Sequence, residues 1–362
     1  MSVRKAAIIL AGGLAKRFQV EGKQWVDKAL ANIHNKPILV HIIERVTPLV
    51  EEIIICVNNE TRKLEYSTVL RNYSINHVKI CTDMRYPNIS GPAVAVTTGL
   101  KVAEADYCIV LPCDTPFVQP AVLEHLFYAV RKSSIAVPIH SDGMLEPLMF
   151  SCRRLTTTQI AETLCWLERD RPDDIIRGSS TVNFVSTVGE LKSKDPELKS
   201  FININFQEDL VKLVTRVFEN GPIKESIRLK IGAPRSSELE QLKEAAKNYA
   251  DKKFKEAFNV LDLLAERFER KSLNFWAGIC REKVGQALFS LSRIKDDAEV
   301  MKIYRLKGAE ALVKAAQNYS SEAQFYDKNH IDFLAKHARE DEFWCKRQLT
   351  PSRLQTQTTE KI

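Results

Sequence analysis

Long apolar runs, paired cysteines and the common phosphate-loop signatures are all missing from this sequence. No apolar run reaches the roughly 18–20 residues that a membrane-spanning helix needs, so we expect no membrane segment. The eight cysteines include no C-x-x-C pair and no zinc spacing, which excludes a zinc module. Neither G-x-x-x-x-G-K-[ST] nor G-x-G-x-x-G occurs, so phosphate loops of the Walker and Rossmann types are excluded as well.

The N-terminus and the cysteines bear on where the protein works. No basic and then apolar leader precedes the first strand-like segment, and we expect no signal peptide. Several cysteines lie inside apolar strand-like segments, where a free thiol packs as a small hydrophobic group. These features predict a reducing, cytoplasmic setting.

The charge balance is moderately basic, with a formal net charge of +7. Such a charge attracts polyanions, for example a nucleotide or a phosphorylated ligand. Solvated lysine-rich helix faces account for it as well. Because no stripe of interleaved basic and aromatic residues is present, we do not expect nucleic acid as a partner.

Strand-like and helix-like segments alternate over residues 1–220. Short apolar runs with turn signals nearby predict strands, and longer segments between them predict helices. The alternation predicts an α/β domain with a three-layer, doubly wound, mostly parallel sheet. The strand order within residues 140–195 stays open. The predicted strands are 5–11, 52–57, 77–82, 106–112 and 134–139, and the helical segments are 36–49, 92–104 and 118–132.

The composition changes beyond Gly221-Pro222. Residues 221–236 contain breaks at Pro222 and at Gly232-Ala233-Pro234, which predicts a linker. Residues 237–348 have almost no proline, and their apolar residues recur every three or four positions. This pattern predicts a helical bundle, and we expect a disordered tail over residues 349–362.

Within the bundle, helices are predicted near 273–292, 297–318 and 320–346. The residues around Tyr249 and Phe254 faintly resemble a tetratricopeptide-type helical hairpin, but no clean repeat of about 34 residues is present. The bundle carries no motif with a chemical meaning. Its exposed face is predicted to bind a protein partner, to mediate self-association or only to stabilise the fold.

The first strand-like run stops at two glycines. Residues 6–13 read Ala-Ala-Ile-Ile-Leu-Ala-Gly-Gly, which predicts a buried parallel strand leading into a loop. Without Cβ atoms at Gly12 and Gly13, backbone N–H groups can approach a ligand closely and hold phosphate. Arg17 and Lys28 add positive charge over the same anion. The segment predicts a nucleoside triphosphate bound at the first strand-to-helix turn.

A carboxylate follows another apolar strand. Asp114 comes directly after the run that ends at Leu111-Pro112-Cys113. Parallel sheets bind ligands at the carboxyl ends of their strands, so Asp114 and the two glycines are expected at one shared site. Alone, such an aspartate also fits the capping of a turn. Beside a phosphate loop it predicts a Mg²⁺ ligand, since Mg²⁺ takes one or two carboxylates together with phosphates and waters.

Four sequence blocks resemble, in their order, the signature of the MobA-like nucleotidyltransferases. The resemblance covers roughly residues 4–215. It implies the nucleotide-diphospho-sugar transferase-like fold, to which the helical domain is an addition. The blocks are Leu10–Phe18 with Asp27–Leu30 and Lys36–Ile38, then Asn88–Pro92 with Thr98–Leu100, then Leu111–Phe117, and finally Phe201–Asn205 with Glu208–Leu210.

The resemblance implies a catalytic group and a metal site. Lys28 would bind the triphosphate and neutralise charge on the leaving pyrophosphate, and Arg17 has a similar but weaker claim. Asp114 would contact the nucleotide and hold Mg²⁺. The second metal ligand would come from Asn205 or Asn203, asparagines that otherwise only shape a turn.

The resemblance also implies contacts to the nucleotide. Leu10, Ala11, Gly12 and Gly13 would form the loop around it. Asp83, at the end of another predicted strand, would contact the nucleotide, although an Asx-turn is the alternative. Asn58 would face the base or the ribose, with Cys56 as the alternative match.

Three features of the sequence, two single positions and one loop length, depart from the pattern of the family. Gln19 stands where the family has a glycine, and residues 18–26 form a longer loop. Ala95 places a methyl group where the family has a glycine that faces the nucleotide. These departures put the guanine preference and full activity in question, whereas Lys28 and Asp114 retain their motifs.

The leading functional prediction is transfer of GMP from MgGTP to phosphorylated molybdopterin, with release of pyrophosphate. Because the attacking phosphate is largely dianionic at neutral pH, no general base is needed. Cytidylyl transfer, or transfer to cobinamide phosphate, phospholactate or a sugar phosphate, are alternatives on the same fold. A nucleotide-sensing adaptor that acts through the helical domain is an alternative of another class.

Overall fold

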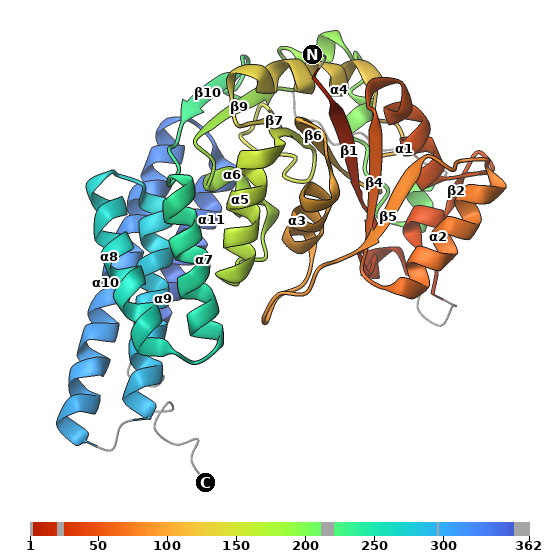
Figure 1. Ribbon diagram of the computed structural model, residues 1–362. Helices are drawn as coiled ribbons and strands as arrows, with labels where there is room; N and C mark the ends of the chain where they lie inside the picture. The colour runs from red at the N-terminus through yellow and green to blue at the C-terminus, as the bar shows by residue number, and fades with distance from the viewer. Residues whose placement is uncertain (1–2, 20–24, 211–220, 295–296, 351–362) are drawn as a thin grey trace. The chain divides into compact units, whose positions relative to one another are not determined.

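The computed structural model describes residues 3–19, 25–210, 221–294 and 297–350. It divides into a first unit, Met1–Lys230, and a second unit, Ile231–Ile362 (Figure 1). Residues 211–220 and most of the predicted tail, 351–362, lie outside the described residues.

The first unit is built on one sheet with the strand order β10-β9-β7-β8-β6-β1-β4-β5. Strands β6, β1, β4 and β5 run parallel to one another, as do β7 and β9. Strand β8 pairs antiparallel with both β6 and β7, and β10 is antiparallel to β9. The strands are β1 (Lys5–Leu10), β4 (Glu52–Val57), β5 (Val78–Thr82), β6 (Tyr107–Pro112), β7 (Ile135–Ile139), β8 (Phe150–Arg153), β9 (Thr181–Ser186) and β10 (Ile227–Lys230).

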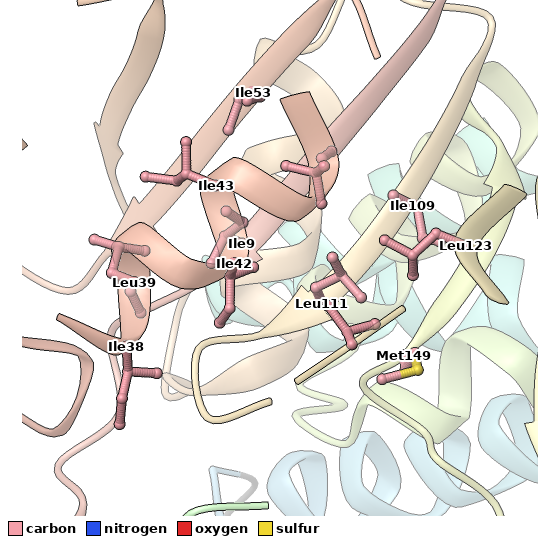
Figure 2. Packing of buried hydrophobic residues seen from close by; sticks show 14 of the residues in the cluster. Ile9, Ile38, Leu39, Ile42, Ile43, Ile53, Ile109, Leu111, Leu123 and Met149 are labelled. Atoms are coloured by element: carbon pink, nitrogen blue, oxygen red, sulfur yellow. The ribbon is translucent and has the colours of Figure 1, made fainter. Parts of the chain in front are cut away.

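Helices cover both faces of this sheet (Figure 1). Alternate strand residues point to opposite faces, so β1 is buried on both sides. Ile9 packs in the hydrophobic cluster with Ile42 and Ile43 of α1 (Figure 2). Ile8 instead faces Gly99 of α3. The helices are α1 (Ile38–Val46), α2 (Glu60–Asn72), α3 (Pro92–Val102), α4 (Pro120–Ala129), α5 (Arg154–Trp166) and α6 (Pro172–Arg177).

These layers confirm the predicted α/β class and its mostly parallel sheet. The segment 36–49 is shorter as a helix than predicted, because β3 (Lys36–Pro37) pairs with β2 (Asn32–Ile33) ahead of α1. Residues 140–195, whose order the sequence left open, supply β8, α5, α6 and β9.

The predicted linker of residues 221–236 contains a strand. Ile227 pairs with Phe184 and Lys230 with Thr181, so β10 extends the sheet of the first unit. The helices of the second unit begin at Ser236. The connection between the two units is therefore shorter than the 221–236 linker.

The second unit is helical, as predicted, and each helix packs against the next in the chain. Its helices are α7 (Ser236–Ala250), α8 (Phe254–Arg270), α9 (Asn274–Arg293), α10 (Ala298–Lys328) and α11 (Asp332–Gln348). Gly278 of α9 allows close packing, since an added Cβ would lie 2.7 Å from the Tyr319 ring of α10. The tetratricopeptide-type hairpin stays a prediction.

One helix boundary in this unit was predicted wrongly. The sequence predicts separate helices over 297–318 and 320–346, whereas α10 continues to Lys328. Ser320-Ser321 does not break it, because neither residue lacks a backbone N–H or needs a left-handed conformation. The break falls at His330, whose φ is 57°. No helix within the described ranges is long and apolar enough to cross a membrane.

Candidate active site

Four parallel strands end at one edge of the sheet, and short hydrogen bonds continue past their ends. The Ala11 N–H donates to Cys56 O at 2.8 Å, and the Asp83 N–H donates to Val57 O at 2.8 Å. The Cys113 N–H donates to Leu10 O at 3.2 Å. The segments after β1, β4, β5 and β6 are thereby fixed side by side. This edge is where ligands bind in open α/β sheets.

Gly12, Asn58 and Asp83 meet at this edge. A Cβ added to Gly12 would lie 3.2 Å from Asn58 N and 3.3 Å from Asp83 Oδ2. The tight approach to a backbone atom explains why glycine occupies this position. Gly13 faces open space, with nothing within 4 Å of an added Cβ. The structure thus brings together three of the residues predicted to contact a nucleotide.

The carboxyl group of Asp83 lies in a poorly solvated environment. Burial raises its pKa from an ordinary value of 3.8 to about 6. Its Oδ1 atom is buried and has no hydrogen-bond partner among the described residues. A ligand with an N–H or O–H group would supply the missing donor.

Asn58 and Cys56, the two alternatives at the end of β4, point to different surroundings. The Asn58 side chain accepts a hydrogen bond from Arg62 Nη1 at 3.3 Å and lies beside Gly12. The Cys56 thiol is buried, 3.6 Å from the Cys81 thiol of β5. Of the two, Asn58 is the residue next to the glycine loop.

Lys28 and Asp114 form an ion pair, with 2.7 Å between Nζ and Oδ2. Their side chains are 14% and 19% exposed, so both still reach solvent. Lys28 is fixed by a local cap, because Asp27 Oδ1 accepts from the Ala29 N–H at 3.0 Å and starts the 3₁₀-helix Lys28–Leu30. An ammonium and a carboxylate that both reach solvent at this edge are the groups that a metal-bound phosphate needs.

The asparagine block lies beside Asp114. The Ile204 N–H donates to Asp114 O at 2.9 Å, which places Asn203 and Asn205 on either side of this contact. The Asn205 N–H in turn donates to Asp209 Oδ2 at 2.7 Å. Both asparagine side chains are partly exposed, and both stay candidates for the second metal ligand.

Two of the remaining positions, Arg17 and Gln19, lie at the start of the longer loop. Arg17, in the 3₁₀-helix Lys16–Phe18, is exposed, and no contact between described residues joins it to Lys28 or Asp114. Gln19 donates to Val26 O at 2.9 Å and accepts from the Val26 N–H at 2.9 Å. The side chain of Gln19 therefore bridges the two ends of the longer loop.

Ala95, the position with an added methyl group, lies inside α3. It is only 4% exposed, and its N–H donates to Gly91 O at 3.1 Å. The methyl group is therefore packed within the fold. Gly91 has a φ of 114°, a conformation that L side chains rarely adopt.

Sequence reasoning missed Arg62 of α2, a buried side chain that connects several of these segments. Its Nη2 donates to Gly13 O at 3.0 Å, and its Nε lies 3.0 Å from Asp27 Oδ2. The available signal was an arginine in the first turn of the helix after Asn58, at the edge where ligands bind. No motif singles it out.

Known proteins that are similar to this chain include members of one nucleotidyltransferase family. A family model described as a MobA-like NTP transferase domain matches residues 7–179. A probable molybdenum cofactor guanylyltransferase of Methanosarcina acetivorans is 30% identical over 214 residues, which is 59% of this chain and 91% of that protein. A molybdenum cofactor guanylyltransferase of Shewanella sp. strain MR-4 is 32% identical over 40% of this chain and 66% of its own length.

Among solved structures, the molybdopterin-guanine dinucleotide biosynthesis protein A of Archaeoglobus fulgidus is similar at 22% identity. The match covers 57% of this chain and 94% of that chain, with a TM-score of 0.46. The matched family segment includes Gly12, Lys28, Asp83 and Asp114 and ends before the helical unit. With 91% of the archaeal relative covered at 30% identity, this chain belongs to the MobA-like nucleotidyltransferase family.

Proposed function

We propose that the protein transfers GMP from MgGTP to phosphorylated molybdopterin and releases pyrophosphate. The observation that carries the proposal is the Lys28–Asp114 pair, 2.7 Å apart at the sheet edge beside the Gly12-Gly13 loop. The names of the similar archaeal and bacterial proteins support the choice of base and acceptor. The reducing cytoplasmic setting belongs to this proposal and agrees with the free thiols of Cys56 and Cys81.

Each residue at the edge then has a role. The backbone of Leu10, Ala11, Gly12 and Gly13 surrounds the phosphates, with N–H groups as donors. Lys28 donates to the phosphates, and its charge stabilises the pyrophosphate as it leaves. Arg17 is proposed to add positive charge from the exposed 3₁₀-helix that follows the glycine loop.

Asp83 and Asn58 receive the nucleoside. Their side chains lie next to Gly12, just beyond the ends of β5 and β4. The buried Oδ1 of Asp83, which has no donor among the described residues, is suited to a base N–H or a ribose hydroxyl. Neither residue is proposed to transfer a proton.

The residues around Asp114 fit Mg²⁺ that arrives with a triphosphate. Among the described residues, no group of three or more His, Cys, Asp or Glu side chains is arranged to hold a metal. Asp114 would supply one carboxylate, and Asn205 or Asn203, on either side of the Ile204 contact to Asp114, would supply an amide oxygen. Phosphates and waters would complete the set that Mg²⁺ prefers. When bound, the ion would neutralise charge on the phosphates.

The attacking group needs little help from the protein. A phosphate monoester has a second pKa of about 6 and is largely dianionic at pH 7, so no base must remove a proton. One bond forms between its oxygen and the α-phosphorus, while the bond from that phosphorus to the pyrophosphate oxygen breaks. The protein aligns the two phosphates and stabilises the charge.

The test is pyrophosphate release by the full chain with Mg²⁺ and GTP, CTP, ATP or UTP in turn. Phosphorylated molybdopterin serves as the acceptor, and reactions without acceptor are the blank. Acceptor-dependent release with GTP alone supports the proposal. Release with CTP alone would show that the enzyme uses cytidine and not guanosine nucleotides. Release only with another phosphorylated acceptor would show that molybdopterin is not the acceptor. Nucleotide binding without turnover would favour the adaptor acting through the helical unit.

A further inference from the structure

The guanidinium of Arg62 joins three separate segments. Its Nη2 donates to Gly13 O in the glycine loop at 3.0 Å. Its Nη1 donates to Asn58 Oδ1 at 3.3 Å, and its Nε forms an ion pair with Asp27 Oδ2 at 3.0 Å. The three nitrogens of one planar group thus contact the loop after β1, the end of β4 and the segment before Lys28.

A second side chain of the same helix completes this connection. The Tyr66 hydroxyl lies 2.9 Å from Asp27 Oδ1 and 3.3 Å from Ala11 O. Asp27 Oδ1 also accepts from the Ala29 N–H. Asp27 Oδ1 thus accepts two hydrogen bonds, whereas Asp27 Oδ2 has the ion-pair contact with Arg62 and no hydrogen bond among the described residues. These contacts fix the orientation of Asp27, the residue directly before Lys28.

The environment of Arg62 makes these contacts strong. The side chains of Arg62 and Asp27 are only 7% and 6% exposed. The Trp25 ring lies over the guanidinium, with 5.0 Å from Arg62 Cζ to the ring centroid. Screening by water is weak at such a site, and an arginine fork directs several hydrogen bonds at once, which a lysine cannot reproduce.

We propose that Arg62 is a positioning residue that holds the Gly12-Gly13 loop and the Asp27-Lys28 segment in register for nucleotidyl transfer. The proposal rests on the proposed function for its catalytic consequence. Arg62 touches backbone and side chains, not the reacting phosphates. A shift of about 1 Å between loop and ammonium is enough to cost roughly 10²-fold in rate, because the phosphates must meet both.

The test replaces Arg62 by lysine, which keeps the positive charge but removes the planar guanidinium that contacts three segments at once. Arg71→Lys is the matched control, since Arg71 lies on the same helix and, within the part of the chain that the structure describes, its side chain donates only to Ser67 and Thr68 of that helix. Hydrogen exchange is measured over residues 11–19, 25–31 and 107–112 of the full chain without nucleotide. Pyrophosphate release gives kcat and KM for the nucleotide.

Arg62→Lys is expected to speed exchange in residues 11–19 and 25–31, while residues 107–112 and the Arg71→Lys control match the wild type. The expected loss in kcat/KM is about 10²-fold. Unchanged exchange in the two segments, or faster exchange everywhere, would overturn the proposal. Exchange decides this even if the wild type releases no pyrophosphate, a result that would count against the proposed function alone.

Asp27→Asn gives a second route if Arg62→Lys does not fold. It weakens the ion pair and keeps the Tyr66 contact, so the same two segments should exchange faster. In the double variant, the loss in kcat/KM should equal that of one single variant, because both act through one contact. Additive losses would contradict a shared role.

Discussion

Lys28 and Asp114 lie 86 positions apart in the chain, yet Nζ of one is 2.7 Å from Oδ2 of the other. Lys28 is the first residue of a capped 3₁₀-helix, and Asp114 follows the end of β6 by two residues. In the protein without nucleotide they neutralise each other. A metal-bound triphosphate would replace this ion pair, because its anionic oxygens would contact Lys28 and its cation would contact Asp114.

Lys28→Met tests one side of this pair. We expect pyrophosphate release to fall by about 10²–10³-fold, the typical loss when one donor to a developing anion is removed. Initial rates at saturating nucleotide measure the change. The control is Lys132→Met, an exposed lysine outside the site, which should leave the rate at the wild-type value. A rate for Lys28→Met within twofold of the wild type would contradict the role of Lys28.

Nucleotide affinity should depend on the ionisation of Asp83. Burial raises the pKa of this carboxyl to about 6, so it becomes protonated as the pH falls through that value. A protonated carboxyl loses acceptor capacity, and binding of MgGTP should weaken below about pH 6. Titration calorimetry of the wild type and Asp83→Asn measures this. The variant should show no such step, and an equal step in both proteins would assign it to another group.

Asp83 should also affect stability, with a sign opposite to that of a salt-bridged carboxylate. Its folded-state pKa is raised from 3.8 to about 6, so folding favours the protonated carboxyl. Above about pH 6 the carboxyl is ionised in the folded protein as well, and its burial then lowers the free energy of unfolding. Asp83→Asn should raise the free energy of unfolding at about pH 8 by roughly 1–2 kcal/mol, discounted for partial exposure. At about pH 4 the difference should vanish. Urea unfolding at both pH values checks it, and a lower stability of the variant at pH 8 would refute the sign.

Two glycines of the first unit should respond differently to alanine. A Cβ on Gly99 would lie 2.3 Å from Ile8 Cγ2 and 3.1 Å from Cys56 Sγ, so α3 or β1 must shift. Overpacking of this kind costs about 1–3 kcal/mol. Gly13→Ala meets nothing within 4 Å and should change the free energy of unfolding by about 0.5 kcal/mol or less. Equal losses in urea unfolding would show that the packing of α3 on β1 is looser than described.

The strand-end residues of the site were predictable because a parallel sheet places the ends of its strands together. Gly12 and Asp114 follow apolar runs, and that pattern alone predicts a shared edge. The alternative at β4 was not decidable from sequence, since a shift of two residues keeps both Cys56 and Asn58 on one face of the strand. The structure separates them by placing Asn58 beyond the strand end.

Arg62 and β10 were beyond sequence reasoning for different reasons. Arg62 contacts Gly13 and Asp27, which are distant from it in the sequence. Such contacts produce no short motif with a fixed spacing from which they could be predicted. Strand β10 has only four residues, and its pairing with β9 depends on the fold already formed. In the helical unit, α10 runs through Ser320-Ser321 because no residue there forces a break.

The most direct test of the account compares the wild type with Asp114→Asn in acceptor-dependent pyrophosphate release from MgGTP. Asparagine keeps the size of the side chain and removes the charge that faces Lys28 and the metal-bound phosphates. The account predicts release by the wild type only when phosphorylated molybdopterin is present, and a loss of about 10²-fold or more in the variant. Equal release by both proteins would contradict a site built on Lys28 and Asp114.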